Sequence, residues 1–214
     1  MDGSNLLFNN VILESMGSFL PEEVWTTEKI ESQLADVYKK LRLPFGRLEL
    51  MAGIKSRRIW GGGTRPSYLS TMAAKNAFSE SKLDPSQMDI LIHSSVCRDF
   101  LEPATASVIH HGLDLSPRCL AFDLSNACLG AINAMVVLAN MIEVGKVKAG
   151  LIVSGENGGP LLLETIKKLK EDRNLTRKSI KKYIANLTIG SGASAIILAH
   201  KDLSPNSPKL LGSM

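Results

Sequence analysis

Short apolar runs alternate with amphipathic stretches along most of this 214-residue chain. Continuous apolar runs predict buried strands, and apolar positions that recur every three or four residues predict helices. Strands are expected at 7–16, 53–60, 88–96, 119–125, 149–156 and 192–200, with another beginning within 209–214. Helices are expected from Thr26 or Thr27 to Leu41, at 68–81, late in 101–113, at 128–147 and within 160–186. This alternation predicts an α/β fold of parallel β-α-β units, with helices on both faces of the sheet.

One predicted helix is apolar on nearly every side. Its sequence, at 128–147, is CLGAINAMVVLANMIEVGKV. A helix of this kind is buried on most sides, as a core helix between two sheets would be. The strands of this chain supply one sheet, so we expect a further layer to cover the remaining face.

Composition narrows the class of protein without naming it. Apolar residues make up 44% of the chain and charged residues 21%, which is typical of a globular protein. The net charge is +4. The one dense basic run, at 167–182, has few aromatic residues interleaved with it, which argues against nucleic-acid binding. This run is interpreted either as a solvated helical face or as a docking surface for an acidic carrier protein or the phosphates of coenzyme A.

The cysteines argue against a disulfide framework and against a metal site. There are three, Cys97, Cys119 and Cys128, and no CxxC pair or histidine-rich cluster accompanies them. The N-terminus MDGSNLLFNN lacks the pattern of a secretory signal, and no apolar run approaches about 18 residues. We expect a cytoplasmic protein with no resident cofactor, no metal and no transmembrane segment.

Cys128 is the candidate nucleophile, because it falls where a predicted strand has ended and a predicted helix begins. A thiol at a helix start lies near unpaired backbone N–H groups, which favour its thiolate form and can bind a developing oxyanion. Cys97 and Cys119 lie within or beside predicted strands and lack this setting. The alternative for Cys128 is a buried, unreactive cysteine.

Three segments together carry a resemblance to a known family. The segments are AGIKSRRIW (52–60), AFDLSNACLGAINAM (121–135) and TIGSGASAIIL (188–198). They resemble, in order, the GI-x-x-R segment, the nucleophile segment and the glycine-rich strand of β-ketoacyl-acyl-carrier-protein synthase III and its relatives in the thiolase superfamily. Ser191 stands where that family usually has an Asp. The resemblance implies the N-terminal half of the five-layered α-β-α-β-α thiolase fold across residues 1–214, with Cys128 as the acyl-accepting residue.

A fourth segment, SSVCRDFLEPATAS (94–107), is similar to the OleA branch of that superfamily. The similarity implies a Claisen condensation of two fatty acyl-CoA molecules without decarboxylation. Such a reaction needs a base for an α-proton, and Glu102 is the candidate, since a carboxylate desolvated by apolar surroundings can serve. From the residues alone, the favoured interpretation of Glu102 is a carboxylate at the start of the following helix, where it interacts with the helix dipole. The alternative activities are those of a carrier-protein synthase III or a hydroxymethylglutaryl-CoA synthase-like enzyme.

The resemblance also implies missing parts. The family's catalytic His and Asn belong to its C-terminal half, and the four histidines of this chain, His93, His110, His111 and His200, match neither motif. These four are predicted to be structural or exposed. The C-terminal half is expected in the same polypeptide or as a separate chain, and a homodimer or heterodimer is expected, with acyl-CoA or an acyl carrier protein as substrate. A non-catalytic subunit or fragment stays the alternative.

Overall fold

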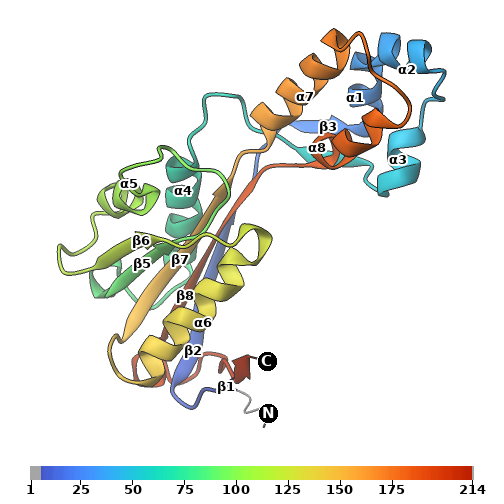
Figure 1. Ribbon diagram of the computed structural model, residues 1–214. Coiled ribbons are helices and arrows are strands. Elements are labelled where there is room, and N and C mark those ends of the chain that lie inside the picture. Colours follow the sequence, from blue (N-terminus) through green and yellow to red (C-terminus); the bar gives the residue numbers. More distant parts are fainter. Residues whose placement is uncertain (1–5, 214) are drawn as a thin grey trace. The chain divides into compact units, whose positions relative to one another are not determined.

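The computed structural model describes residues 6–213, and the side chains from Phe8 to Gly212. Residues 1–5 of the N-terminal segment, and Met214 of the last predicted strand, lie outside the described residues. The chain divides into two compact units (Figure 1). The sheet unit comprises Met1–Phe19, Arg65–Glu156 and Ala193–Met214, and the helical unit comprises Leu20–Thr64 and Asn157–Gly192. The assignment of 1–214 to a single thiolase-like domain stays a prediction.

The sheet unit is built on a five-stranded mixed sheet with strand order β2-β8-β7-β5-β6. Its strands are β2 (Val11–Phe19), β5 (Ile90–His93), β6 (Leu120–Asp123), β7 (Ala149–Glu156) and β8 (Gly192–His200). β5 runs parallel to both β6 and β7, whereas β2 is antiparallel to β8. The predicted α/β class is therefore confirmed. A separate pair joins β1 (Leu6–Leu7) to β9 (Gly212–Ser213), so the strand predicted at 7–16 is divided in two.

Helices lie on both faces of this sheet (Figure 1). Helices α4 (Pro66–Ser79) and α5 (Thr105–Gly112) lie on one face, and α6 (Gly130–Glu143) lies on the other. The connections of this unit include the short 3-10 turns η1 (Pro85–Gln87), η2 (Ala127–Leu129) and η4 (Lys201–Leu203). On the α6 face, Ile90, Ile152 and Leu138 form part of a fully buried core. On the α4 face, Gly17 lies against the backbone of α4, where a side chain would meet the carbonyl of Ala73 and the amide of Ala77.

Only one side of α6 is buried. Ala134, Leu138 and Ile142 face the sheet, whereas Ile132 is 57% exposed and Val137 37% exposed. The prediction that this helix is buried on most sides is therefore wrong for the chain by itself, because none of the described residues covers Ile132 and Val137. The helix is also shorter than the predicted 128–147, since its first residues form η2.

The helical unit contains five helices, four of them short, and a small two-stranded antiparallel sheet among its described residues. These are α1 (Thr27–Gln33), α2 (Ala35–Leu41), α3 (Arg47–Ala52), α7 (Gly159–Glu171) and α8 (Ile184–Thr188), with the 3-10 turn η3 (Ser179–Tyr183) and the strands β3 (Val24–Thr26) and β4 (Ser56–Arg58). Thr26 caps α1 as predicted, accepting from the amide of Lys29 at 3.0 Å. The helix predicted to reach Leu41 breaks at Leu34, and the strand predicted at 53–60 shortens to β4.

No helix within residues 6–213 has the length and apolar character needed to cross a membrane. The most apolar one, α6, has 14 residues and is therefore about 21 Å long.

Candidate functional site

Cys128 lies in η2, the 3-10 turn that leads directly into α6, and its side chain is exposed. The preceding residue, Ala127, has a φ of 45°, which is unusual for a residue with a Cβ. Among the described residues, none accepts a hydrogen bond from the backbone N–H of Cys128. The predicted position at a helix start is confirmed, and the turn presents both the thiol and a free amide.

Two side chains hold the segment that precedes this turn. Asn126 donates to the side-chain oxygen of Asn133 at 2.5 Å, which ties the turn to the first part of α6. Ser94, just after β5, donates from its hydroxyl to the carbonyl of Leu124 at 2.9 Å. Gly130 lies so close to the Ser94 hydroxyl that a Cβ there would collide with it. The sequence analysis missed Ser94, because its contact depends on strand register.

The other cysteines have different surroundings. Cys119 is buried, and burial together with the nearby Asp89 raises the pKa of its thiol to about 11. Such a thiol is unreactive at neutral pH. Cys97 is half-buried in the connection after β5. Within residues 6–213, no group of three or more histidine, cysteine or acidic residues could hold a metal ion.

Glu102 lies in the exposed connection between β5 and α5. Leu101 and Pro103 beside it are also exposed, Leu101 by 86%, so this chain alone does not desolvate the carboxylate. The side chain of Glu102 forms no hydrogen bond or ion pair within the described residues. The start of α5 is instead capped by Asp123, which accepts from the amides of Thr105 at 3.0 Å and Ala106 at 2.9 Å. Glu102 therefore does not have the helix-start role that was its alternative.

The four histidines occupy different environments. His93 is 1% exposed at the end of β5, and its Nδ1 lies 3.3 Å from Oδ1 of Asp123. On α5, His110 is half-buried with Nε2 3.0 Å from the carbonyl of Ser116, whereas its neighbour His111 is exposed. His200 is half-buried and accepts from the amide of Asp202. None of the four forms a hydrogen bond with Cys128 within the described residues.

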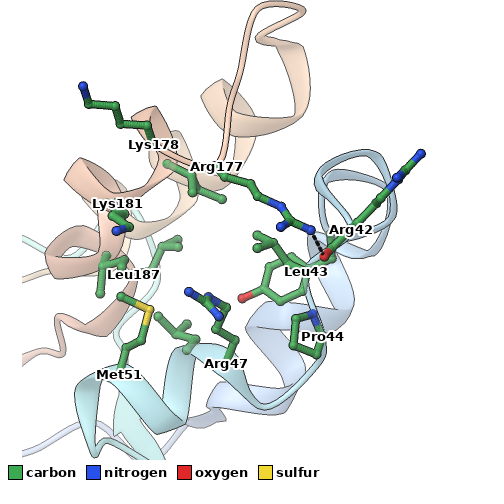
Figure 2. A pocket seen from close by; sticks show the side chains of 13 residues that line it. Arg42, Leu43, Pro44, Arg47, Met51, Arg177, Lys178, Lys181 and Leu187 are labelled. Carbon is green, nitrogen blue, oxygen red and sulfur yellow. Dashed lines mark hydrogen bonds between the residues drawn. The ribbon is translucent and has the colours of Figure 1, made fainter.

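The helical unit contains a separate pocket of about 390 Å³ (Figure 2). Its apolar lining comes from Leu43, Pro44, Leu48, Met51, Ile180, Ile184 and Leu187, and Tyr38 also lines it. Its charged lining is entirely basic: Arg42, Arg47, Arg177, Lys178 and Lys181. Three of these belong to the basic run at 167–182, so that run is partly a pocket wall and not only a solvated helical face. An apolar floor with a cationic rim suits an amphipathic anion.

A buried carboxylate fixes one of the arginines. Glu31 is 2% exposed and accepts from the amides of Gly46 at 2.6 Å and Leu48 at 2.7 Å, on either side of Arg47. The guanidinium of Arg47 points into the pocket (Figure 2). Arg177 is held by the carbonyls of Leu41 at 2.6 Å and Arg42 at 2.5 Å. The sequence analysis missed the pocket, because it did not predict α3.

The nucleophile segment matches a known family description. Residues 122–162, which include Cys128, match 3-oxoacyl-[acyl-carrier-protein] synthase III. Over 209 residues the chain is 32% identical to the acyl-CoA:acyl-CoA alkyltransferase of Xanthomonas campestris, covering 98% of this chain and 62% of that protein. Over 196 residues it is 36% identical to the enzyme of the same name from Shewanella oneidensis, covering 92% of this chain and 56% of that protein. The chain thus spans about three fifths of these relatives.

Solved structures show the same likeness. The structure of Xanthomonas campestris OleA with cerulenin bound superposes with a TM-score of 0.93 at 32% identity, covering 97% of this chain and 62% of that one. A β-ketoacyl-[acyl-carrier-protein] synthase III of Histophilus somni is 28% identical over 187 residues, which are 87% of this chain and 52% of that protein. Fold, motif order and identity agree, and the chain belongs to the thiolase superfamily, as an OleA-like protein.

Proposed function

We propose that the complete protein carrying this chain condenses two fatty acyl-CoA thioesters by a Claisen reaction, through an acyl-enzyme on Cys128. The observation that carries the proposal is the exposed thiol on the turn at the start of α6, beside a backbone N–H for which the described part of the chain offers no acceptor. The names of the relatives from Xanthomonas campestris and Shewanella oneidensis support the same reaction class.

In the first step, the Cys128 thiolate attacks the thioester carbonyl of one acyl-CoA. The carbonyl oxygen becomes negatively charged, and the amide of Cys128 is placed to stabilise it. Collapse of this intermediate expels the coenzyme A thiolate and leaves the acyl group on the cysteine sulfur. The small side chain of Ala127, directly before the exposed thiol, leaves space for the acyl chain.

The second step needs a base, and we assign it to Glu102. The carboxylate takes an α-proton from the second acyl-CoA, and the resulting carbanion attacks the acyl-cysteine carbonyl. A carbon–carbon bond forms, the cysteine thiolate leaves, and the product is a 2-alkyl-3-ketoacyl-CoA. Because Glu102 is exposed and carries no internal partner, its desolvation has to come from another surface, such as the neighbouring subunit of a dimer.

The pocket of the helical unit supplies a reason for preferring coenzyme A as the carrier. Its basic side chains, Arg47 among them, which points into the cavity (Figure 2), suit the phosphates of a nucleotide, and its apolar floor suits the uncharged part of the same molecule. Carrier-protein thioesters are the second candidate substrate, favoured by the synthase III match over residues 122–162. Turnover with acyl-CoA but not with acyl carrier protein separates the two.

The exposed side of α6 supports the view that this chain needs a covering layer. We assign that layer to the C-terminal half of the thiolase fold, in the same polypeptide or as a separate chain, together with the missing His and Asn. A dimer, by which Glu102 reaches the partner's site, and a cytoplasmic location belong to the same proposal.

The test is a two-step assay on the complete enzyme with a long-chain acyl-CoA. Mass spectrometry of the intact protein should show one acyl group on the peptide that contains Cys128, and the product should have the mass of a 2-alkyl-3-ketoacyl-CoA. Glu102→Ala should leave acylation largely intact and slow condensation by roughly 100- to 10,000-fold. A mixed dimer with Cys128→Ala in one chain and Glu102→Ala in the other should recover roughly one working site in two. Condensation at the wild-type rate by Glu102→Ala would refute the assignment of the base.

A further inference from the structure

The segment that carries Glu102 is an exposed span between fixed ends. At its start, Glu156 accepts from the amides of Val96 at 2.6 Å and Cys97 at 3.0 Å. Asp99 then accepts from the amide and the hydroxyl of Ser67, at 2.9 Å and 2.5 Å. Residues 100–103 follow, all exposed, before the chain enters α5.

Asp123 fixes the far end of this span. It is the last residue of β6, and its two carboxylate oxygens accept from the amides of Thr105 and Ala106, the first two residues of α5. The residue at the N-cap position, Ala104, has no side chain that could take this role. The same Asp123 begins the five-residue path to Cys128 along the backbone. One carboxylate thus connects the base segment to the nucleophile segment.

His93 orients Asp123. The two residues are paired across the parallel strands β5 and β6, and Nδ1 of His93 lies 3.3 Å from Oδ1 of Asp123. Burial lowers the pKa of His93, against the opposing effect of the carboxylates of Asp123, Glu156 and Asp99. The neutral ring therefore donates its Nδ1 proton to the carboxylate, since a carboxylate can only accept. Its Nε2 is buried and has no partner among the described residues.

The backbone at His93 and the side chain of Ser94 also hold Leu124, which lies on the segment leading to Cys128. The carbonyl of His93 accepts from the amide of Leu124 at 2.9 Å, and the next residue, Ser94, donates to the carbonyl of Leu124. Successive side chains of a strand point to opposite faces. His93 therefore faces α5 and the base segment, while Ser94 faces Gly130 at the start of α6.

We propose that Asp123, oriented by His93, is a positioning residue that holds the Glu102 segment in place at the end of β6, so that Glu102 can reach the cysteine of the neighbouring subunit. This inference rests on the proposed function for its chemical meaning. Asp123 does not touch the reacting atoms. It holds the base where the second step needs it, so its loss should impair condensation more than acylation.

The first test measures the coupling without any activity. Asp123→Asn keeps the side-chain volume but loses the charge, and its NH₂ group cannot accept. Hydrogen exchange of the amides in 99–106 should quicken by about tenfold or more, the loss expected for a hydrogen bond to a charged group. The matched control is Asp89→Asn, because Asp89 accepts in the same way from the amides of Lys148 and Ala149 at the other end of β5. Unchanged exchange at 99–106 in Asp123→Asn would overturn the proposal.

The second test uses the complete enzyme and compares the two chemical steps. Asp123→Asn should lower the condensation rate of the acylated enzyme by roughly tenfold and change the acylation rate of Cys128 little. His93→Leu should give the same split, whereas His93→Asn, which places an amide donor near the position of Nδ1, should restore part of the condensation rate. A parallel fall in both steps, or the same split in Asp89→Asn, would show a merely structural role. If the wild-type enzyme formed no condensation product, the proposed function would fail, and the exchange result alone would decide whether Asp123 holds the segment.

Discussion

Two helices of equal length, α4 and α6, cover opposite faces of the same sheet and have opposite outer surfaces. Each has 14 residues. The exposed residues of α4 are Tyr68, Lys75, Asn76 and Ser79, of which only Tyr68 is a large apolar side chain, whereas the exposed residues of α6 are the aliphatic Ile132 and Val137. Because exposed apolar surface favours association, we expect the outer side of α6 to associate with another surface more readily than that of α4.

The difference extends to how closely each helix approaches the sheet. Gly17 lets the backbone of α4 lie directly on β2, while on the other face Gly150 meets only the side chains of Ile90 and Leu138. The α4 contact is therefore backbone against backbone, which cannot yield, and the α6 contact is side chain against side chain, which can. The candidate nucleophile, Cys128, lies in the turn before α6, the helix with the exposed aliphatic side.

The largest expected effect is at the start of α6. Cys128→Ala in the complete enzyme should abolish acyl labelling by a long-chain acyl-CoA, because the sulfur forms the acyl bond. Cys119→Ala should keep the labelling, since the Cys119 thiol is buried and its pKa is raised to about 11. Intact-protein mass spectrometry measures both. An acyl adduct that persists in Cys128→Ala would assign the nucleophile to another residue.

The next largest effect is a difference in the free energy of unfolding between variants at the α4 contact and at the α6 contact. Gly17→Ala should lower the free energy of unfolding by about 3 kcal/mol, since the new methyl group meets the backbone of Ala73 and Ala77. Gly150→Ala should cost about 1 kcal/mol, because the side chains of Ile90 and Leu138 can move. Urea denaturation of the two variants gives the comparison, and equal losses would contradict the distinction between the two faces.

Self-association of the chain should depend on the outer side of α6 and not on that of α4. The isolated chain of 23.2 kDa is expected to self-associate, and the double variant Ile132→Lys/Val137→Lys should weaken this by about tenfold or more. The matched change on the other helix, Tyr68→Lys, removes a side chain that is 54% exposed and should have little effect. Sedimentation velocity is the measurement. A monodisperse wild-type monomer would remove the argument for a covering layer.

The smallest expected effect is a pH dependence of the free energy of unfolding, caused by His93 on the α5 side of the sheet. Burial lowers the pKa of His93, so the unfolded chain binds a proton near pH 6.5 before the folded chain does. Stability should therefore fall as the pH drops from about 6.5 through the folded pKa of His93. His93→Asn should remove this slope in urea titrations at successive pH values. Glu14 and Glu143 have pKa values held below 4.5 by hydrogen bonds that outweigh burial, and they act only at lower pH.

Much of the sheet unit could be predicted from the sequence, because its strands are continuous apolar runs with clear ends. The strands β7 and β8 have the predicted bounds, and the start of α6 places Cys128 as expected. The helix α3 was not predicted. Its boundaries depend on Gly46 and Gly53, with φ of 81° and 70°, and on a hydrogen bond that the amide of Gly46 donates to Glu31.

The residues of the candidate site could be predicted only where a single run of sequence identifies them. Cys128 and Glu102 each belong to a recognisable run of residues. The contacts of Asp123 with His93 and with Thr105 join residues 30 and 18 positions apart, and they follow from the register of β5 against β6. Periodicity along a sequence does not encode that register.

The antiparallel pairing of β2 with β8 bears on how this protein is made. The first long strand of the sheet, beginning at Val11, pairs with the last, which ends at His200. A ribosome that adds about 5–20 residues per second delivers the partner on the order of ten seconds or more after the first strand emerges. Pairings of such long sequence separation also form slowly. During synthesis, β2 is therefore an unpaired strand edge, and a chaperone that shields nascent chains would find its substrate there.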